Sequence, residues 1–169
     1  VSLFQMRTAA VRGLCHHRVR VQSLGRSPYE DTLHLQKFHQ NALMRGEFED
    51  SSLLLVEHDP AVYTSGRASR KTESNRNDIL KTSRGGQVTW HGPGQIIIYP
   101  LLHLDSLKLG PKKLVQILEL AVANVLGQFA ITTTSREGAR GVFVNDAKIA
   151  SLGLRIRKGV SYHGLALNH

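Results

Sequence analysis

The C-terminal third of the chain alternates short apolar runs with tight turns, and this pattern constrains the fold more than any other feature. The expected strands are ITTT at 131–134, GVFV at 141–144, KIASLGLRIR at 148–157 and VSYHGLALN at 160–168. Turns are expected at Asn145-Asp146 and at Lys158-Gly159, because Asn, Asp and Gly tolerate turn conformations of the backbone. This part of the chain is therefore expected to build a sheet.

Two helices are predicted before these strands. Ser27-Pro28-Tyr29-Glu30 combines a Ser N-cap, Pro at the first helical position and Glu three residues after the cap, and the helix is expected to run to about Arg45 with Gly46 as its stop. Its apolar stripe is Leu35, Phe38, Ala42 and Leu43. The second helix, 111–129, has an apolar face made of Leu114, Ile117, Leu118, Ala121, Val122 and Val125.

Three further strands are predicted between the helices. SLLLVEH at 52–58 is a short apolar run that ends at Asp59-Pro60, and a polar loop with a basic cluster at Arg67, Arg70 and Lys71 follows it at 61–78. QVTW at 87–90 and QIIIYPLL at 95–102 read as two strands joined by the turn at 91–94. The order of elements favours an α+β fold, a mixed sheet with helices packed on one side, over a regular βαβ repeat.

The N-terminal segment differs in composition from the rest. Much of the net charge of +9 comes from arginines in the first 28 residues, where there is no acidic residue: Arg7, Arg12, Arg18, Arg20 and Arg26. Such a composition is typical of a mitochondrial transit peptide, so residues 1–23 are interpreted as a basic leader and 24–169 as the folded domain. The alternatives are a disordered basic leader or a run translated from upstream of the true start. Mitochondrial localisation is the resulting expectation.

Several classes of function have little support in the sequence. The single cysteine, Cys15, cannot form an internal disulfide or a Cys-rich zinc site, and the nine histidines show no metal-binding spacing. With 6% aromatic residues and mixed charges, no nucleic-acid surface is expected. No apolar run approaches the roughly 18 residues that a membrane helix needs. Neither a Walker lysine nor a GxGxxG motif indicates nucleotide binding.

The stretch RGGQVTWHGPGQ, 84–95, is the first candidate for chemistry. Its adjacent glycines, Gly85 and Gly86, permit positive φ, so a thioester carbonyl or the polar end of a substrate could come close to the backbone. An arginine such as Arg84 at the start of the loop suits a phosphate or carboxylate. The alternative interpretation is a Gly-rich hairpin whose arginine and His91 face water.

Lys148 is the second candidate, at the start of an otherwise apolar strand. Burial there would depress its pKa and make it a usable base, whereas a lysine at a strand end often extends to the surface. Ser151 and Gly153 on the same strand could supply a donor and a close backbone approach, or a β-bulge. A third segment, Tyr162-His163-Gly164-Leu165-Ala166, says little alone, since a histidine in a strand usually has a structural role.

Together these segments closely resemble the lipoyl(octanoyl) transferase family. The resemblance begins at Leu24, includes Glu57-His58-Asp59-Pro60 and 63–67, and rests most firmly on RGGQVTWHGPGQ and KIASLGLRIRKGVSYHGLALN. It implies the α+β fold of biotin and lipoyl protein ligases. It also implies covalent catalysis without metal or ATP, in which a cysteine takes octanoate from octanoyl acyl carrier protein and delivers it to a lysine of a lipoyl domain. The implied acceptors are lipoyl domains of 2-oxo acid dehydrogenases and the glycine cleavage H protein.

The resemblance also implies roles for particular residues. Lys148 would lower the pKa of the nucleophilic cysteine, and the substrate-contacting residues would be Arg84, Gly85, Gly86, Gln87, Val88, Thr89, Trp90, His91, Ser151, Leu152, Gly153, Gly164, Leu165 and Ala166. Relatives usually carry a tyrosine or another aromatic residue at position 90. The cysteine is expected beyond His169, so the domain is interpreted as incomplete at its C-terminus.

Two other interpretations remain beside the transferase. A lipoate or biotin protein ligase on the same fold would first form an acyl-adenylate with ATP, and a catalytically inactive fragment would only bind an acyl group or a lipoyl domain. The HGPGQ continuation resembles the transferases rather than the ligases.

Overall fold

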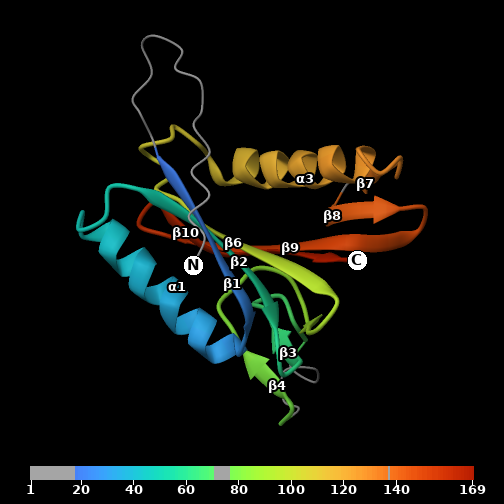
Figure 1. Ribbon diagram of the computed structural model, residues 1–169, viewed down its shortest axis with the longest axis horizontal. Helices are drawn as coiled ribbons and strands as arrows, with labels where there is room; N and C mark the ends of the chain where they lie inside the picture. The colour runs from blue at the N-terminus through green and yellow to red at the C-terminus, as the bar shows by residue number, and fades with distance from the viewer. Residues whose placement is uncertain (1–17, 71–76, 137) are drawn as a thin grey trace.

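The computed structural model describes residues 18–70, 77–136 and 138–169. Its main sheet has seven strands in the order β1-β2-β6-β10-β9-β8-β7, and a three-stranded sheet has the order β4-β3-β5 (Figure 1). In the main sheet β1 is parallel to β2 and the other pairs are antiparallel, so the sheet is mixed as predicted. The elements are β1 Val19–Ser27, α1 Tyr29–Met44, β2 Ser51–His58, β3 Val62–Ser65, β4 Ile79–Lys81, β5 Thr89–His91, β6 Gln95–Leu101, α3 Pro111–Gly127, β7 Thr134–Arg136, β8 Ala139–Val144, β9 Ala147–Arg157 and β10 Val160–Asn168.

The two helices cover opposite faces of the main sheet, so the expectation that they pack on one side is wrong (Figure 1). Because side chains alternate between the faces of a strand, β6 serves both cores. Ile97 and Tyr99 belong to the core under α1, whereas Ile98 packs with Val122 and Leu126 of α3. None of the helices in the described ranges is long and apolar enough to cross a membrane.

The start of α1 differs from the predicted capping arrangement. Ser27 is the last residue of β1, the N-cap is Pro28, and no side chain caps the helix. The Thr32 hydroxyl instead bonds the carbonyl oxygen of Pro28 at 3.1 Å and the Ser27 hydroxyl at 3.3 Å. The predicted stop is confirmed, since Gly46 has a φ of 71° directly after the helix.

The buried face of α1 is also not the predicted apolar stripe. Ala42 and Leu43 are buried, but Phe38 is 56% exposed. Gln36 and Gln40 are buried instead, because they bond backbone groups of β10: Gln36 Oε1 accepts from the His163 N–H at 2.9 Å, and Gln40 Nε2 donates to the Val160 carbonyl at 3.2 Å.

Strand β1 begins inside the predicted leader. It pairs with β2 from Val19↔Ser51 to Ser27↔His58, so residues 19–23 of the expected leader belong to the main sheet. Residues 1–17 of the leader lie outside the described residues.

The small sheet corrects two other expectations. The predicted polar loop contains β3, which pairs with both β4 and β5, while part of it, 71–76, lies outside the described residues. The turn at 91–94 does not close a hairpin, because β5 belongs to the small sheet and β6 to the main sheet.

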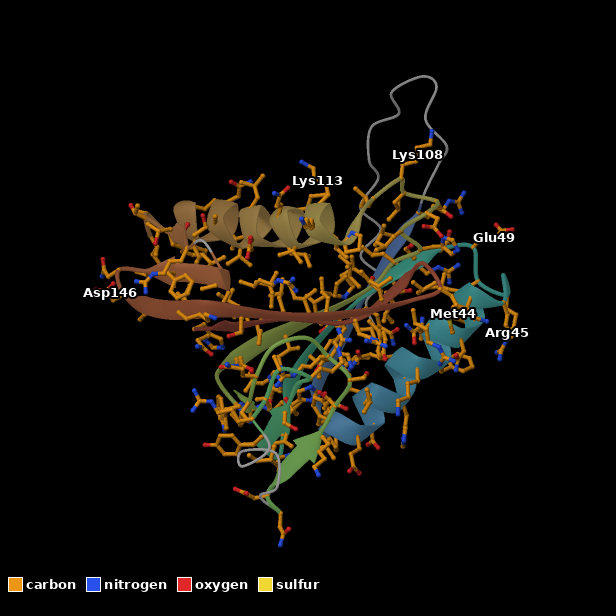
Figure 2. The ribbon with its side chains drawn as sticks, turned by 180° about the vertical axis from the view of Figure 1, so that it is seen from behind. Met44, Arg45, Glu49, Lys108, Lys113 and Asp146 are labelled. Carbon is orange, nitrogen blue, oxygen red and sulfur yellow. The ribbon has the colours of Figure 1, made fainter. Side chains whose placement is uncertain are left out.

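The predicted C-terminal strands are confirmed, although the first is displaced to Thr134–Arg136. Figure 2 shows Asp146 at the tip of the β8–β9 hairpin, far from Met44 and Arg45 at the end of α1. The turn residues Asn145 and Lys158 have φ values of 52° and 45°, as tight turns between strands require.

Candidate active site

A cavity of about 780 Å³ lies on the α1 side of the main sheet, and the loop that leads into β5 forms part of its wall. A volume of this order suits a small-molecule substrate or a flexible arm. All the site residues inferred from the family resemblance line it except Trp90, and Lys148 is among them. The structure thus brings the three candidate segments, 84–91, 148–153 and 163–166, into one wall.

The pleat of β5 explains why Trp90 is excluded. Thr89 and His91 line the cavity, and the residue between them must point to the other face of the strand. Trp90 lies opposite Tyr63 of β3 and is 38% exposed.

Because side chains alternate along β9 and β10 as well, the wall residues of these strands point to one face of the sheet or the other. Ala166 is paired with Ser151 and Gly164 with Gly153, on the face that carries α1. Leu152 and Leu165 belong to the core on the α3 side, so they bound the cavity mainly with their backbone.

Arg84 is buried, which excludes the interpretation that it faces water. Its Nε and Nη2 donate to the Thr64 hydroxyl at 3.2 and 2.9 Å, Nη2 also donates to the Thr64 carbonyl at 2.7 Å, and Nη1 donates to the Gly85 carbonyl at 3.0 Å. Burial lowers the pKa of Arg84, while Tyr29 and Tyr99 act in the opposite direction. Among the described residues no carboxylate bonds this guanidinium, so its positive charge acts on the cavity.

The glycines of the loop allow its backbone to pack closely against β9 and against the residue that follows β3. The Gly85 N–H bonds the Leu154 carbonyl at 3.1 Å, and a Cβ added to Gly153 would lie 2.9 Å from the Gly85 oxygen. A Cβ on Gly66 would overlap the carbonyl of Gly86. The loop is therefore fixed between β9 and the end of β3.

Two buried histidines are neutral hydrogen-bonding groups: His91 lines the cavity, and His58 lies behind it with the ring centres 6.0 Å apart. His91 Nδ1 donates to Gln95 Oε1 at 2.8 Å. His58 Nδ1 donates to the Ser27 carbonyl at 2.9 Å, and its Nε2 accepts from the Tyr99 hydroxyl at 2.7 Å. Burial lowers the pKa of both rings, that of His91 to about 4.

His163, which sequence reasoning left without a function, is a third neutral histidine in the wall. It is 2% exposed, has a φ of 56°, and stacks on Tyr162 at 4.5 Å. Its Nε2 lies 3.3 Å from the Ser83 hydroxyl, while Nδ1 has no hydrogen-bond partner among the described residues. Burial, reinforced by the charge of Arg84, lowers its pKa to about 3.

Lys148 lines the cavity and is exposed, so of the two alternatives the structure shows the lysine that extends to the surface from a strand end. Its Nζ donates to the Arg140 carbonyl at 3.1 Å and lies 5.3 Å from the centre of the Phe143 ring. Its methylene groups pass Gly141, where an added Cβ would be 3.2 Å from Cε.

Tyr29, Arg67, Ile97, Tyr99 and Arg140 also line the cavity and were missed. Tyr99 had a visible signal, since it is the one aromatic side chain in the run QIIIYPLL. None of the described lining residues is Asp or Glu, so the cavity is cationic along its described wall. No three potential metal ligands gather anywhere in 18–70, 77–136 or 138–169.

The chain is similar to octanoyltransferases along most of its length. The family described as "Lipoyl protein ligase A/B catalytic domain" matches residues 28–169. An octanoyltransferase of Klebsiella pneumoniae is 44% identical over 156 residues, which cover 90% of this chain and 72% of that protein. One of Shewanella piezotolerans is 43% identical over 159 residues, covering 92% and 70%.

Solved structures of ligases share the fold at low identity. P. falciparum LipL1 in complex with lipoate has a TM-score of 0.66 at 16% identity, over 89% of this chain and 47% of that chain. Lipoate-protein ligase A bound with ATP has a TM-score of 0.65 at 16% identity, over 89% and 66%. These similarities establish an α+β ligase-type fold and nothing about the reaction.

Proposed function

Since this chain belongs to the lipoyl protein ligase A/B catalytic domain family, we propose that it is an octanoyltransferase that moves octanoate from octanoyl acyl carrier protein to a lysine of lipoyl domains. The observation that carries the proposal is 44% identity to an octanoyltransferase over 90% of the chain. The acceptors we propose are the lipoyl domains of 2-oxo acid dehydrogenases and the glycine cleavage H protein.

The proposed chemistry runs through a cysteine thioester, because a thiolate divides one acyl transfer into two easier steps. The described residues contain no cysteine, and the proposed nucleophile lies beyond His169. The register of β9 and β10 ends where Leu167 faces Ala150, and two more residues in the same register would bring the chain opposite Lys148. A thiol that follows β10 closely would then approach the Lys148 ammonium, which favours the thiolate.

The first prediction separates the transferase from an ATP-dependent ligase. The full-length protein should move octanoate from octanoyl acyl carrier protein to a lipoyl domain with no ATP present. Lys148→Ala should slow formation of the hydroxylamine-labile acyl-enzyme by about 10- to 100-fold, because a thiol near its free pKa is mostly protonated at neutral pH. Intact-protein mass spectrometry measures both effects.

Lys113→Ala is the matched control, since Lys113 is an exposed lysine on α3 (Figure 2) and does not line the cavity. Octanoate-dependent pyrophosphate exchange without thioester transfer would replace the proposal with the ligase. An acylation rate that Lys148→Ala leaves unchanged would remove this lysine from the mechanism.

The second prediction concerns location. We propose that the acid-free, arginine-rich N-terminus directs the protein to mitochondria. Because β1 begins at Val19, only residues 1–18 should be fused to a reporter protein in the test. A fluorescent reporter carrying them should enter mitochondria, and replacing Arg7, Arg12 and Arg18 by Gln should prevent entry. A reporter that stays diffuse with the original arginines would contradict the idea.

A further inference from the structure

A chain of side-chain hydrogen bonds fixes which nitrogen of His91 carries the proton. Gln95 and Asn168 are paired in the register of β6 and β10, and Gln95 Nε2 donates to Asn168 Oδ1 at 2.8 Å. This bond turns Gln95 Oε1 towards His91 Nδ1, which lies 2.8 Å away. Because the amide oxygen only accepts, this orientation of the two amides assigns the ring proton to Nδ1. The lone pair of the neutral ring is therefore on Nε2.

His91 Nε2 is left available to the cavity. The ring lines the cavity at 7% exposure, and none of the described residues forms a hydrogen bond with Nε2. Tyr29 stacks on the ring at 5.9 Å with an angle of 13°, which limits its rotation. The cavity wall thus presents one oriented hydrogen-bond acceptor at His91.

The groups that face His91 keep it neutral. Burial is the main reason that the pKa of His91 is lowered and the ring is neutral. The positive charge of Arg84 in the loop and the His58 ring of β2, which lies 6.0 Å away, act in the same direction. The other titratable groups around it are Tyr29 of α1, Tyr99 of β6 and His163 of β10. None of these neighbours is a carboxylate that would favour an imidazolium.

A neutral acceptor matters for the second half of the proposed reaction, on which this inference rests. A lysine amine can attack a thioester only when it is unprotonated, and the positive charges of Arg84 and Lys148 along the wall disfavour its ammonium form. The neutral amine then needs an acceptor for one N–H while its own lone pair faces the acyl carbon. An imidazolium at this position could not fill that role.

We propose that His91 Nε2 accepts a hydrogen bond from the attacking amine of the acceptor lysine, and that Gln95 and Asn168 are positioning residues that orient His91. In the step the new C–N bond forms, the C–S bond breaks, and the electron pair of the C–S bond leaves on the cysteine sulfur. The proton lost by the amine passes by way of His91 to that thiolate, so the thiol is regenerated and no other reactant is consumed.

The test isolates this step in single turnovers of preformed octanoyl-enzyme mixed with a lipoyl domain. His91→Asn keeps a nitrogen at the Nδ1 position and removes Nε2. It should slow amide formation by about 10- to 100-fold, at or below the usual range for general acid–base catalysis, because the ring is a weak base. His91→Gln, which places a polar atom near the Nε2 position, should recover part of the rate. His34→Asn, on the exposed face of α1, is the matched control and should leave the rate unchanged.

Two further readouts separate orientation from general damage to the fold. Gln95→Glu should raise the apparent pKa in the pH profile of amide formation, because a carboxylate at Nδ1 stabilises the imidazolium. In the wild-type chain, 15N NMR of His91 should show a protonated Nδ1 and an unprotonated Nε2. This measurement does not depend on the folding of any variant.

These measurements distinguish a wrong role for His91 from a wrong assignment of the protein as a transferase. If the acyl-enzyme forms normally and His91→Asn transfers octanoate at the wild-type rate, or if NMR places the proton on Nε2, the role of His91 is refuted while the transferase stands. If the wild-type protein forms no acyl-enzyme, the transferase and the role of His91 both fall.

Discussion

Gly164→Ala is expected to unfold the domain or to destabilise it by about 4 kcal/mol or more. Gly164 lies in the middle of β10, between β6 and β9, opposite Gly153. A Cβ at this position would overlap the carbonyl oxygen of Ile98 and lie 2.7 Å from Cδ of Pro100. Both atoms belong to the rigid backbone or ring of β6, so relief requires moving two central strands apart.

Urea unfolding followed by circular dichroism measures the effect, and Gly127→Ala is its matched control. Gly127 ends α3, a Cβ there meets nothing within 4 Å, and its φ is not in the left-handed region. This change should be neutral or stabilise by about 0.5–1 kcal/mol, since alanine favours a helix over glycine. An unchanged urea midpoint for Gly164→Ala would show that β6 and β10 can separate without cost.

Acid is expected to destabilise the domain strongly between pH 6.5 and pH 4. The pKa values of His91 and His163 fall from 6.5 to about 4 and about 3 on folding, so between these values the unfolded chain binds more protons than the folded one. Stability must then rise with pH through this window and is lost as pH falls below 6.5. The two rings together should account for several kcal/mol, since one pKa unit corresponds to about 1.4 kcal/mol. Their effects are coupled, because each ring feels the same Arg84 charge.

The measurement is the free energy of unfolding in urea at several pH values. His163→Gln and His91→Gln should each flatten the slope between pH 6.5 and pH 4, even where they lower the stability at pH 7. His34→Gln, an exposed substitution of the same kind, should leave the slope of the parent chain in place. A wild-type stability that is constant across this window would mean that both rings take up protons in the folded chain as readily as in the unfolded chain.

The local patterns of the sequence determined the elements whose residues interact mainly with near neighbours. The existence of α3, the Gly46 stop, and the turns at Asn145-Asp146 and Lys158-Gly159 were predicted correctly, because helices and tight turns depend on residues within a few positions of each other. The apolar face predicted for α3 was only partly right, since Ile117, Ala121 and Val125 are exposed while Leu114, Val122 and Leu126 are buried. The stretch 84–91 was recognisable as a candidate site because its glycines and Arg84 form an unusual local cluster, and its residues except Trp90 line the cavity. The motif-bearing segments indeed share one cavity.

Only the tertiary structure decided which side chains are buried and which strand pairs with which. Strand β1 was hidden in an arginine-rich segment because its stabilising partner is β2, about thirty residues later in the pairing Val19↔Ser51. Lys148 is exposed despite its apolar strand, because the β8–β9 hairpin places it at the cavity rim. His163, Gln36 and Tyr99 are polar residues that the fold buries. A polar side chain can be buried where a segment distant in the sequence supplies a hydrogen-bonding partner or covers it. The sequence alone does not show which segment that is.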